Sequence, residues 1–222
     1  MKMHLARLGI VFLLGGSLGG CALANVASEP APQLFMLTAG HPASGGAEAG
    51  GAAARILVDD FTASAAIDTA RIVFQPNPNE IKYYADARWA DRAPAMIQSL
   101  MIETLQNSGR FASVAARGSE IRGDLAVKGD IRQFAAEANG EATNVHVDFF
   151  VRLVRLEDRD IVASRDFNAV VPVTGSGIAA VVAAHDAALR QTLSEIMLWT
   201  LAETSKPARD TAPVSASRKK KK

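Results

Sequence analysis

The sequence is poor in the residues that most catalytic and metal sites require. Among 222 residues there is one cysteine, Cys21, so the chain cannot close a disulfide on itself. There is no H-E-x-x-H and no paired Cys/His spacing, which argues against a zinc site. There is also no G-x-x-x-x-G-K-[ST] loop to cradle the phosphates of a nucleotide. Gly175-Ser176-Gly177 lacks the outer glycines of a G-x-S-x-G nucleophile elbow and is better interpreted as a helix start. We therefore predict neither catalytic, cofactor-binding nor metal-binding residues.

Charge is distributed unevenly along the chain. The formal net charge is +1, yet Lys206–Lys222 carries seven Lys/Arg and one Asp, and the first twenty residues carry Lys2 and Arg7. The remainder, Cys21–Ser205, therefore has a net charge of −7. A nucleic-acid-binding domain carries its positive charge on a folded face, interleaved with aromatic residues. An acidic body with a basic tail excludes that class, so no nucleic-acid partner is expected.

The basic tail, residues 205–222, is rich in Pro, Ala and Ser, and we expect it to be disordered. Two interpretations stay open. The tail is either merely solvated, or it contacts anionic lipid headgroups or peptidoglycan carboxylates, with each basic residue adding about 1 kcal/mol at a membrane surface. The residues concerned are Arg218, Lys219, Lys220, Lys221 and Lys222.

Long hydrophobic runs are also scarce, and the one at the N-terminus is short. Residues 1–20 combine a basic start with an apolar core, Leu8–Leu18, that is too short to span a bilayer, which is typical of a signal peptide. The segment ends in Leu18, Gly19 and Gly20, directly before Cys21. Small residues before a lone cysteine resemble the bacterial lipobox. The alternative is an ordinary secretory signal that happens to be followed by a cysteine.

The lipobox resemblance implies a covalent diacylglyceryl thioether on Cys21 and an N-acyl chain, such as palmitate, on its amine. Two or more acyl chains give stable anchoring, whereas one gives only marginal binding. The mature protein would be anchored in the cell envelope and face the periplasm, with residues 21–33 as a tether. Residue 22 is Ala rather than Asp, which by analogy with enterobacterial sorting favours the outer membrane over the inner membrane.

The segment Ile81–Val114 predicts one packing unit of strand, aromatic corner, helix and strand. Ile81–Tyr84 is rich in β-branched and aromatic residues. Asp91 is the expected N-cap of the helix and Pro94 suits its first turn. Gly109 suits the position after the helix. The apolar stripe comprises Ile97, Leu100, Met101 and Leu105.

The spacing within this unit resembles a known family. Y-Y-x(4)-W-A-x(3)-P, beginning at Tyr83, precedes a helix that ends in S-G-R-F-x-x-V, and this pattern is similar to the ABC-type transport auxiliary lipoproteins, the PqiC/YmbA-like proteins. The resemblance extends over roughly Gln33–Glu203. It implies a non-catalytic component of an ABC/MCE-type lipid transport system, with an MCE-domain protein and the permease and ATPase subunits as partners. It also implies docking at a membrane, which is compatible with a homo-oligomer, and a fold similar to the TolB N-terminal domain. The alternative is a structural or assembly lipoprotein of the envelope.

Period-two alternation in three long runs predicts an antiparallel sheet with one covered face. Gly129 in the first run suggests a bulge or a close neighbour, and Phe150 interrupts the polar face of the second. A second helix is expected from Gly175 to about Thr204. The domain, residues 34–204, is thus predicted to be α+β, with a mostly antiparallel sheet of about seven strands and two amphipathic helices on one face. The strands are predicted at Leu34–Thr38, Arg55–Phe61, Arg71–Gln75, Ile81–Tyr84, Asp124–Phe134, Thr143–Leu156 and Ile161–Val173.

Two pairs of titratable residues could be mistaken for catalytic groups. His146 and Asp148 lie two apart on one strand and therefore share a face, which could form a proton-transfer pair or half a metal site in an envelope hydrolase. A solvated polar face predicts the same residues, and we prefer it. Asp59 and Asp60 are adjacent, so a strand would point them to opposite faces.

Two further groups of residues have alternative interpretations. His185 and Asp186 are adjacent on the second helix, and we interpret both as residues of the helix edge. Tyr83, Tyr84 and Trp89 form either an exposed surface that binds lipid or a partner, or a buried corner that packs the first helix. For Trp89 the buried corner is the preferred interpretation.

Overall fold

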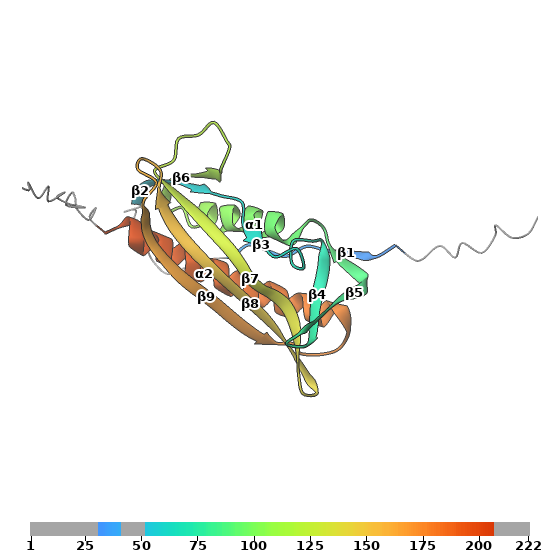
Figure 1. Ribbon diagram of the computed structural model, residues 1–222. Helices are drawn as coiled ribbons and strands as arrows, with labels where there is room; N and C mark the ends of the chain where they lie inside the picture. Colours follow the sequence, from blue (N-terminus) through green and yellow to red (C-terminus); the bar gives the residue numbers. More distant parts are fainter. Residues whose placement is uncertain (1–30, 41–51, 207–222) are drawn as a thin grey trace, which may run out of the picture. The chain divides into compact units, whose positions relative to one another are not determined.

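The computed structural model describes residues 31–40 and 52–206. These residues form a mixed nine-stranded sheet with two helices (Figure 1). The predicted signal peptide, the lipobox with Cys21, the Gly- and Ala-rich segment 41–51 and the tail residues 207–222 lie outside the described residues. The elements are β1 (Gln33–Phe35), β2 (Ala52–Val58), β3 (Thr62–Ala63), β4 (Arg71–Asn77), β5 (Glu80–Trp89), α1 (Ala93–Asn107), β6 (Phe111–Ala116), β7 (Leu125–Asn139), β8 (Ala142–Arg155), β9 (Ile161–Pro172) and α2 (Gly177–Thr204).

The long strand β7 organises the sheet. Along one edge it pairs antiparallel with β8, which in turn pairs antiparallel with β9. Along its other edge it pairs in parallel with three shorter strands in succession, β2, β3 and β4. Beyond these, β6 pairs with β2, β5 with β4, and the three-residue β1 with β5. The sheet thus has a long antiparallel half and a half of short strands.

The prediction of a mostly antiparallel sheet of about seven strands is wrong in both respects, because the sheet is mixed and has nine strands. Alternation along a strand reports which face is buried and carries no information about the direction of the neighbouring strand. The two-residue strand β3 is too short to show a period. The α+β class and the covered face are confirmed.

Helix α1 begins at Ala93, and its N-cap is Arg92 rather than the predicted Asp91. The Asp91 carboxylate accepts a 2.6 Å hydrogen bond from the Arg92 backbone N–H, one residue too early to satisfy the helix. Pro94 lies in the first turn as expected. The helix ends at Asn107 with Ser108 as its C-cap, and Gly109 follows with a φ of +62°, which confirms the predicted glycine stop.

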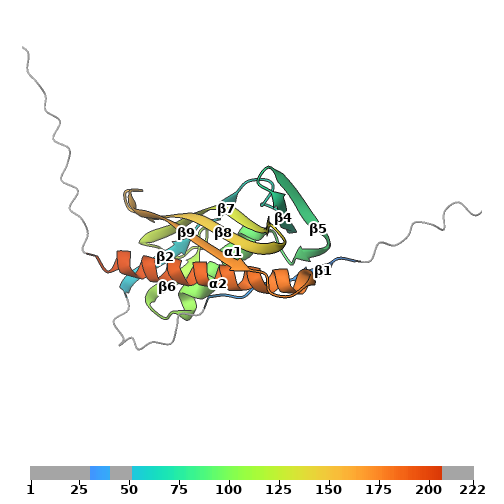
Figure 2. The same cartoon turned by 90° about the horizontal axis from the view of Figure 1, so that it is seen from below.

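Helix α2 lies across β8 and β9, and α1 lies beside β6, β2 and α2 (Figures 1 and 2). We call the sheet face against these helices the covered face, and the opposite one the open face. One hydrophobic core forms between the covered face and the helices. Its largest fully buried side chains are Trp89, Phe134, Phe149, Phe167, Ile56, Ile72, Ile97, Met101, Leu105, Leu153, Leu189 and Leu193.

Gly129 has the close neighbour that the sequence suggested. A Cβ at this position would lie 2.2 Å from Cε1 of Phe61, whose ring occupies the space over β7. Phe61 in turn makes an edge contact with Phe149 of β8, with the ring centroids 5.9 Å apart. A glycine in β7 therefore lets an aromatic ring enter the core directly above the sheet.

Candidate functional site

Trp89, in the family-like motif, lies in a buried aromatic cluster. Trp89 at the end of β5, Phe134 of β7 and His185 of α2 are 2%, 1% and 0% exposed. The His185 ring centroid lies 5.2 Å from each of the other two, and the rings meet edge to face. The cluster therefore packs β5, β7 and α2 against one another.

His185 is therefore not a helix-edge residue, and that prediction is wrong. Neighbouring residues on a helix diverge in direction, so one member of a pair can enter the core while Asp186 stays at the surface. The missed signal is the spacing of four residues that places His185 in the apolar stripe between Val181 and Leu189.

The chemistry of His185 suits a structural residue. Its Nδ1 lies 2.9 Å from the Val181 carbonyl oxygen, an acceptor, so Nδ1 carries the proton of the neutral ring. Its Nε2 is buried and has no hydrogen-bond partner among the described residues. Burial lowers the pKa of His185 to about 4, so the ring is neutral at pH 7.

Of the two interpretations of Tyr83, Tyr84 and Trp89, the structure agrees with the buried corner preferred for Trp89, which is 2% exposed, and the alternative of an exposed surface does not hold for that residue. The two tyrosines are half-buried. The Tyr84 ring packs 5.8 Å from that of Phe74, and burial raises the pKa of its hydroxyl. The ring of Tyr83 lies 3.7 Å beneath the Arg71 guanidinium carbon. An aromatic surface built from all three side chains does not exist in this fold.

Residues Leu34–Gly40, which we call the anchor arm, lie between the sheet edge and the helices. Side chains alternate along the arm: Leu37 and Ala39 are buried, whereas Leu34 and Met36 are 68% and 78% exposed. The arm starts in β1, on β5, and passes onto the helical layer (Figure 1). The family-like motif and the chain that follows Cys21 thus meet at one edge of the domain.

Hydrogen bonds fix the arm at both ends. The Phe35 carbonyl accepts from the Ala90 N–H at 2.8 Å. The backbone N–H and the hydroxyl of Thr38 both donate to Asp186 Oδ1 at 2.7 Å. Next along the chain, the Gly40 N–H donates to the buried Thr104 Oγ1 at 2.9 Å. The arm is therefore an integral part of the fold and not an extension of the preceding segment.

His146 and Asp148 do share the open face, but no hydrogen bond joins them. His146 Nδ1 lies 3.1 Å from Glu137 Oε1, and its Nε2 lies 2.7 Å from Asn168 Nδ2. Within residues 31–40 and 52–206 no group of three acidic, His or Cys side chains could hold a metal ion. The structure brings His146 into a cross-strand polar network and leaves Asp148 outside it.

Asp59 and Asp60 point in different directions, as the sequence predicted. Asp59 forms an ion pair with Lys128 at 2.8 Å and a longer one with Arg117. Asp60 instead accepts a 3.0 Å hydrogen bond from Gln98 of α1. The two carboxylates do not form a catalytic pair.

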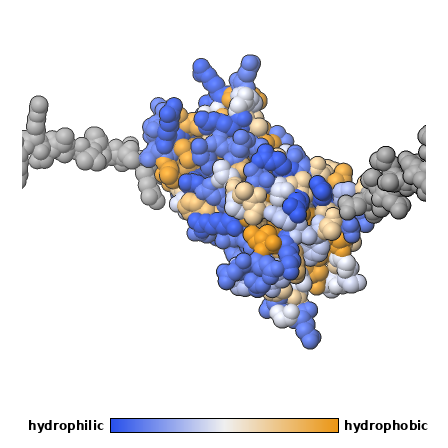
Figure 3. Space-filling model, turned by 45° about the vertical axis from the view of Figure 1, so that its right-hand side comes forward, coloured by the Kyte–Doolittle hydropathy of each residue, from blue (hydrophilic) through white to orange (hydrophobic). Residues whose placement is uncertain are grey.

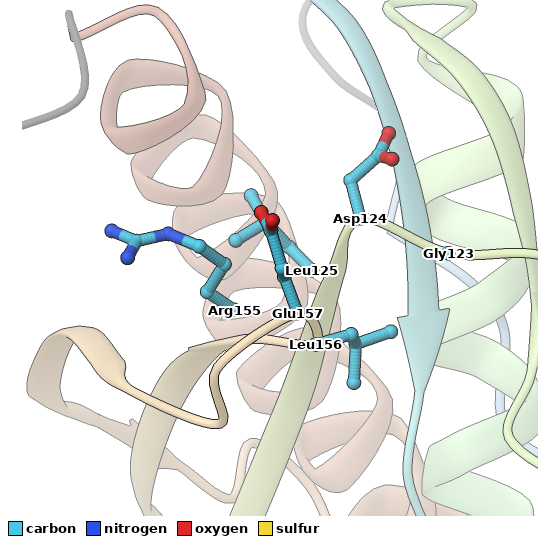
Figure 4. A pocket seen from close by; sticks show the side chains of 6 residues that line it. All are labelled: Gly123, Asp124, Leu125, Arg155, Leu156 and Glu157. Atoms are coloured by element: carbon cyan, nitrogen blue, oxygen red, sulfur yellow. The ribbon is translucent and has the colours of Figure 1, made fainter.

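Two surface pockets are lined by a mixture of charged, polar and apolar side chains. The first, about 400 Å³, lies at the start of β7 (Figure 4), where the Asp124 carboxylate turns toward β2 and binds Arg55. The second, about 370 Å³, lies at the start of α1, where Arg92 and Asp68 form an ion pair. Hydrophilic side chains also cover most of the face drawn in Figure 3. Neither pocket resembles the apolar groove that a bound lipid chain would need.

The family model for the ABC-type transport auxiliary lipoprotein component matches residues 35–197, which include the anchor arm except Leu34, the motif around Trp89 and most of α2. The chain belongs to this family. Its members are auxiliary lipoprotein components of ABC-type transport. The predicted family is confirmed.

Individual relatives agree with this membership. The chain is 29% identical to protein XCC0632 from Xanthomonas campestris, described under the family name DUF330, whose crystal structure superposes with a TM-score of 0.70 over 77% of this chain and 95% of that one. A crystal structure of an uncharacterised protein shares the fold at 12% identity, with a TM-score of 0.59 over 77% of this chain and 99% of that one. An uncharacterised protein of Bradyrhizobium diazoefficiens is 32% identical over 152 residues, 67% of this chain. The match spans only 40% of that curated relative's length.

No helix among the described residues is long and apolar enough to span a bilayer.

Proposed function

We propose that this protein is the non-catalytic, lipid-anchored subunit of an ABC/MCE-type lipid transport system and docks that system at a membrane. Its anchor is the acylated Cys21, and its domain faces the periplasm, with the outer membrane favoured over the inner. The partners are an MCE-domain protein and the permease and ATPase subunits. The observation that carries the proposal is the family match over residues 35–197, which starts fourteen residues after the lipobox cysteine.

The organisation of the chain supports a tethering role. In the proposed arrangement residues 1–20 are removed as a signal peptide, residues 21–33 form the tether, residues 34–204 form the auxiliary domain, and residues 205–222 form a basic tail. The tether would lead directly into the anchor arm, which the hydrogen bonds of Thr38 and Gly40 hold against both helices. A force transmitted through the tether would therefore act directly on both helices.

The two histidines of the described domain have surroundings that suit structural roles. His185, the most deeply buried titratable ring, packs between aromatic rings, and His146 belongs to a polar network that stretches across strands. Both are placed to stabilise the sheet. An envelope hydrolase based on His146 and Asp148 would need the two groups within hydrogen-bond reach of a common substrate atom. The two ring nitrogens of His146 are instead at hydrogen-bond distance from Glu137 and Asn168.

Mass spectrometry of the membrane-extracted native protein, beside a Cys21→Ala variant and after chemical crosslinking, tests the proposal. A mature N-terminus at Cys21 that carries acyl chains, with MCE or transporter peptides crosslinked to it, is the expected result. A lipidated protein crosslinked only to other envelope proteins would instead favour a structural or assembly role. An unlipidated, soluble mature protein would overturn the anchor.

A further inference from the structure

We propose that Leu34 and Met36 contact the bilayer that holds Cys21, and that this contact sets the edge on which the domain rests. We call the two residues the contact pair. The inference rests on the proposed lipid anchor and adds a second, non-covalent membrane contact to it. The ligand is the interfacial region of the lipid surface, where headgroups meet the acyl chains.

The contact pair is unusual for the surface of this domain. Leu34 and Met36 are 68% and 78% exposed, more than any other large hydrophobic side chain recorded as exposed in the described residues. They occupy alternate positions of the extended arm, so both project from the same side. On a strand with one buried face, the outward positions are normally polar. Two successive outward-facing positions of the arm, Leu34 and Met36, are instead apolar.

The fold prevents these side chains from turning inward. Leu37 and Ala39, on the opposite side of the arm, are already buried in the core. β1 is held in register against Ala87–Trp89, and Thr38 is held by two hydrogen bonds to Asp186. Exchanging the two sides would require a one-residue slip that breaks these contacts and exposes the buried set.

The length of chain before the arm indicates the occupant. Leu34 comes thirteen residues after Cys21, and a chain of that length spans at most about 45 Å when fully extended. Strand β1, in which the arm starts, is the first element of the described fold after the cysteine. Once the anchor is inserted, this edge of the domain is therefore confined to the neighbourhood of the bilayer surface.

The neighbouring side chains suit a lipid headgroup region. Arg88 of β5 lies opposite Leu34 in the parallel register and is exposed. A cation beside apolar side chains is the pattern of interfacial membrane contact. Asp86, two residues earlier on β5, is also exposed, so the two apolar side chains and not net charge provide the attraction.

A membrane fits the contact pair better than a second protein does. A specific protein interface buries roughly 800 Å² on each partner, which two side chains cannot supply. A contact with the bilayer need not be stable alone, because the anchor already holds the domain at a high effective concentration near the surface.

Quenching of tryptophan fluorescence by brominated lipids tests the inference on the full-length, acylated protein. Met36→Trp places a reporter in the contact pair, and the control Ile121→Trp places one at a site that is 51% exposed in the segment between β6 and β7, away from β1 (Figure 1). The native Trp89 and Trp199 are buried and give the same background in both variants. In vesicles of phosphatidylethanolamine and phosphatidylglycerol with brominated acyl chains, we expect the reporter in Met36→Trp to be quenched at least about twofold more than the reporter in Ile121→Trp.

Equal quenching of the two reporters, in protein that floats with the vesicles, would overturn the inference and leave the anchor intact. Aqueous iodide gives a second test, because it quenches only a reporter that is in contact with water. The inference would also be overturned if the Met36→Trp reporter became shielded from iodide on addition of a transporter subunit or at higher protein concentration, and not on addition of vesicles. Failure of the protein to float, with no acyl group on Cys21 by mass spectrometry, would instead remove the proposed function on which the inference rests.

Discussion

Among the described residues one histidine lies on each side of the sheet, His185 on helix α2 and His146 on strand β8, and their surroundings differ. His185 lies on the covered side, fully buried between the rings of Trp89 and Phe134, with its Nε2 unpartnered among the described residues. His146 lies on the open face, half-buried, with Glu137 and Asn168 at hydrogen-bond distance from its two ring nitrogens. One ring acts as an apolar aromatic group, and the other acts as a polar link between strands.

The remaining side chains of each face follow the same division. On the open face Phe150 lies between Asp130 of β7 and Asp166 of β9, its partners in register. The guanidinium carbons of Arg132 and Arg152 lie 4.7 and 5.3 Å from its ring centroid, and each arginine pairs with one of the two aspartates. Packing against α2 therefore stabilises one face, and a lattice of ion pairs around an aromatic ring organises the other.

Trp89→Ala is expected to have the largest effect, a loss of about 3–5 kcal/mol in the free energy of unfolding, because it opens a cavity in a core that cannot collapse easily. Urea unfolding followed by circular dichroism measures it. The matched change on the open face, Phe150→Ala, removes a half-buried ring and its cation–π contacts, and we expect about 1–2 kcal/mol. Equal losses for the two variants would show that the faces contribute alike.

His185 is expected to make stability depend on pH. Its folded pKa of about 4 lies below the ordinary value of 6.5, so between these values the unfolded chain binds a proton that the folded chain does not. Stability due to His185 is therefore fully present above pH 6.5, falls as the pH decreases through this window, and levels off below pH 4. The expected loss is about 3 kcal/mol, measured by urea unfolding at a series of pH values.

A matched pair of variants separates this effect from the titration of carboxylates. His185→Leu keeps the side chain apolar and is expected to flatten the slope between pH 6.5 and pH 4. His146→Gln, on the open face, is expected to keep the slope of the wild type. If both variants lost the slope equally, burial of His185 would not be its cause.

The sequence was a good guide to the covered face and a poor one to strand direction. Apolar spacing predicted α1, α2, the long strands and the burial preferred for Trp89, because burial leaves a periodic record in the sequence. Parallel pairing of β2, β3 and β4 with β7 was missed, because pairing depends on residues far apart in the sequence that no local pattern encodes. The helix start was misplaced at Asp91, since the Asp91 carboxylate bonds to Arg92 instead of capping.

The candidate sites were predictable in part, for related reasons. The closeness of the anchor arm to the proposed lipid anchor could be predicted from the order of residues along the chain, because the arm comes directly after the proposed tether. The position of His185 did not, because a titratable side chain is normally expected at the surface, and only the aromatic partners from β5 and β7 make its burial favourable. The Phe150 lattice needed the register of three strands, which places Asp130 and Asp166 on either side of the ring.

Gly129→Ala tests packing on the covered face from the opposite direction, by adding volume. The new methyl group would collide with the Phe61 ring, and we expect a loss of about 1–3 kcal/mol, measured by thermal or urea unfolding. Combining it with Phe61→Leu relieves the collision, so the two losses are expected to be less than additive. Strict additivity would mean that the glycine is required for its backbone and not for the space it leaves.

The smallest effect is expected for the ion pairs of the open face. Arg132 and Asp166 are half-exposed or more, and exposed pairs contribute about 0–1 kcal/mol because water and salt screen them. Arg132→Ala is therefore expected to shift the urea midpoint only slightly, and the shift is expected to shrink further at high salt. A loss as large as that of Trp89→Ala, insensitive to salt, would mean that the open face is covered in the assembled protein, since only burial strengthens such a pair to that extent.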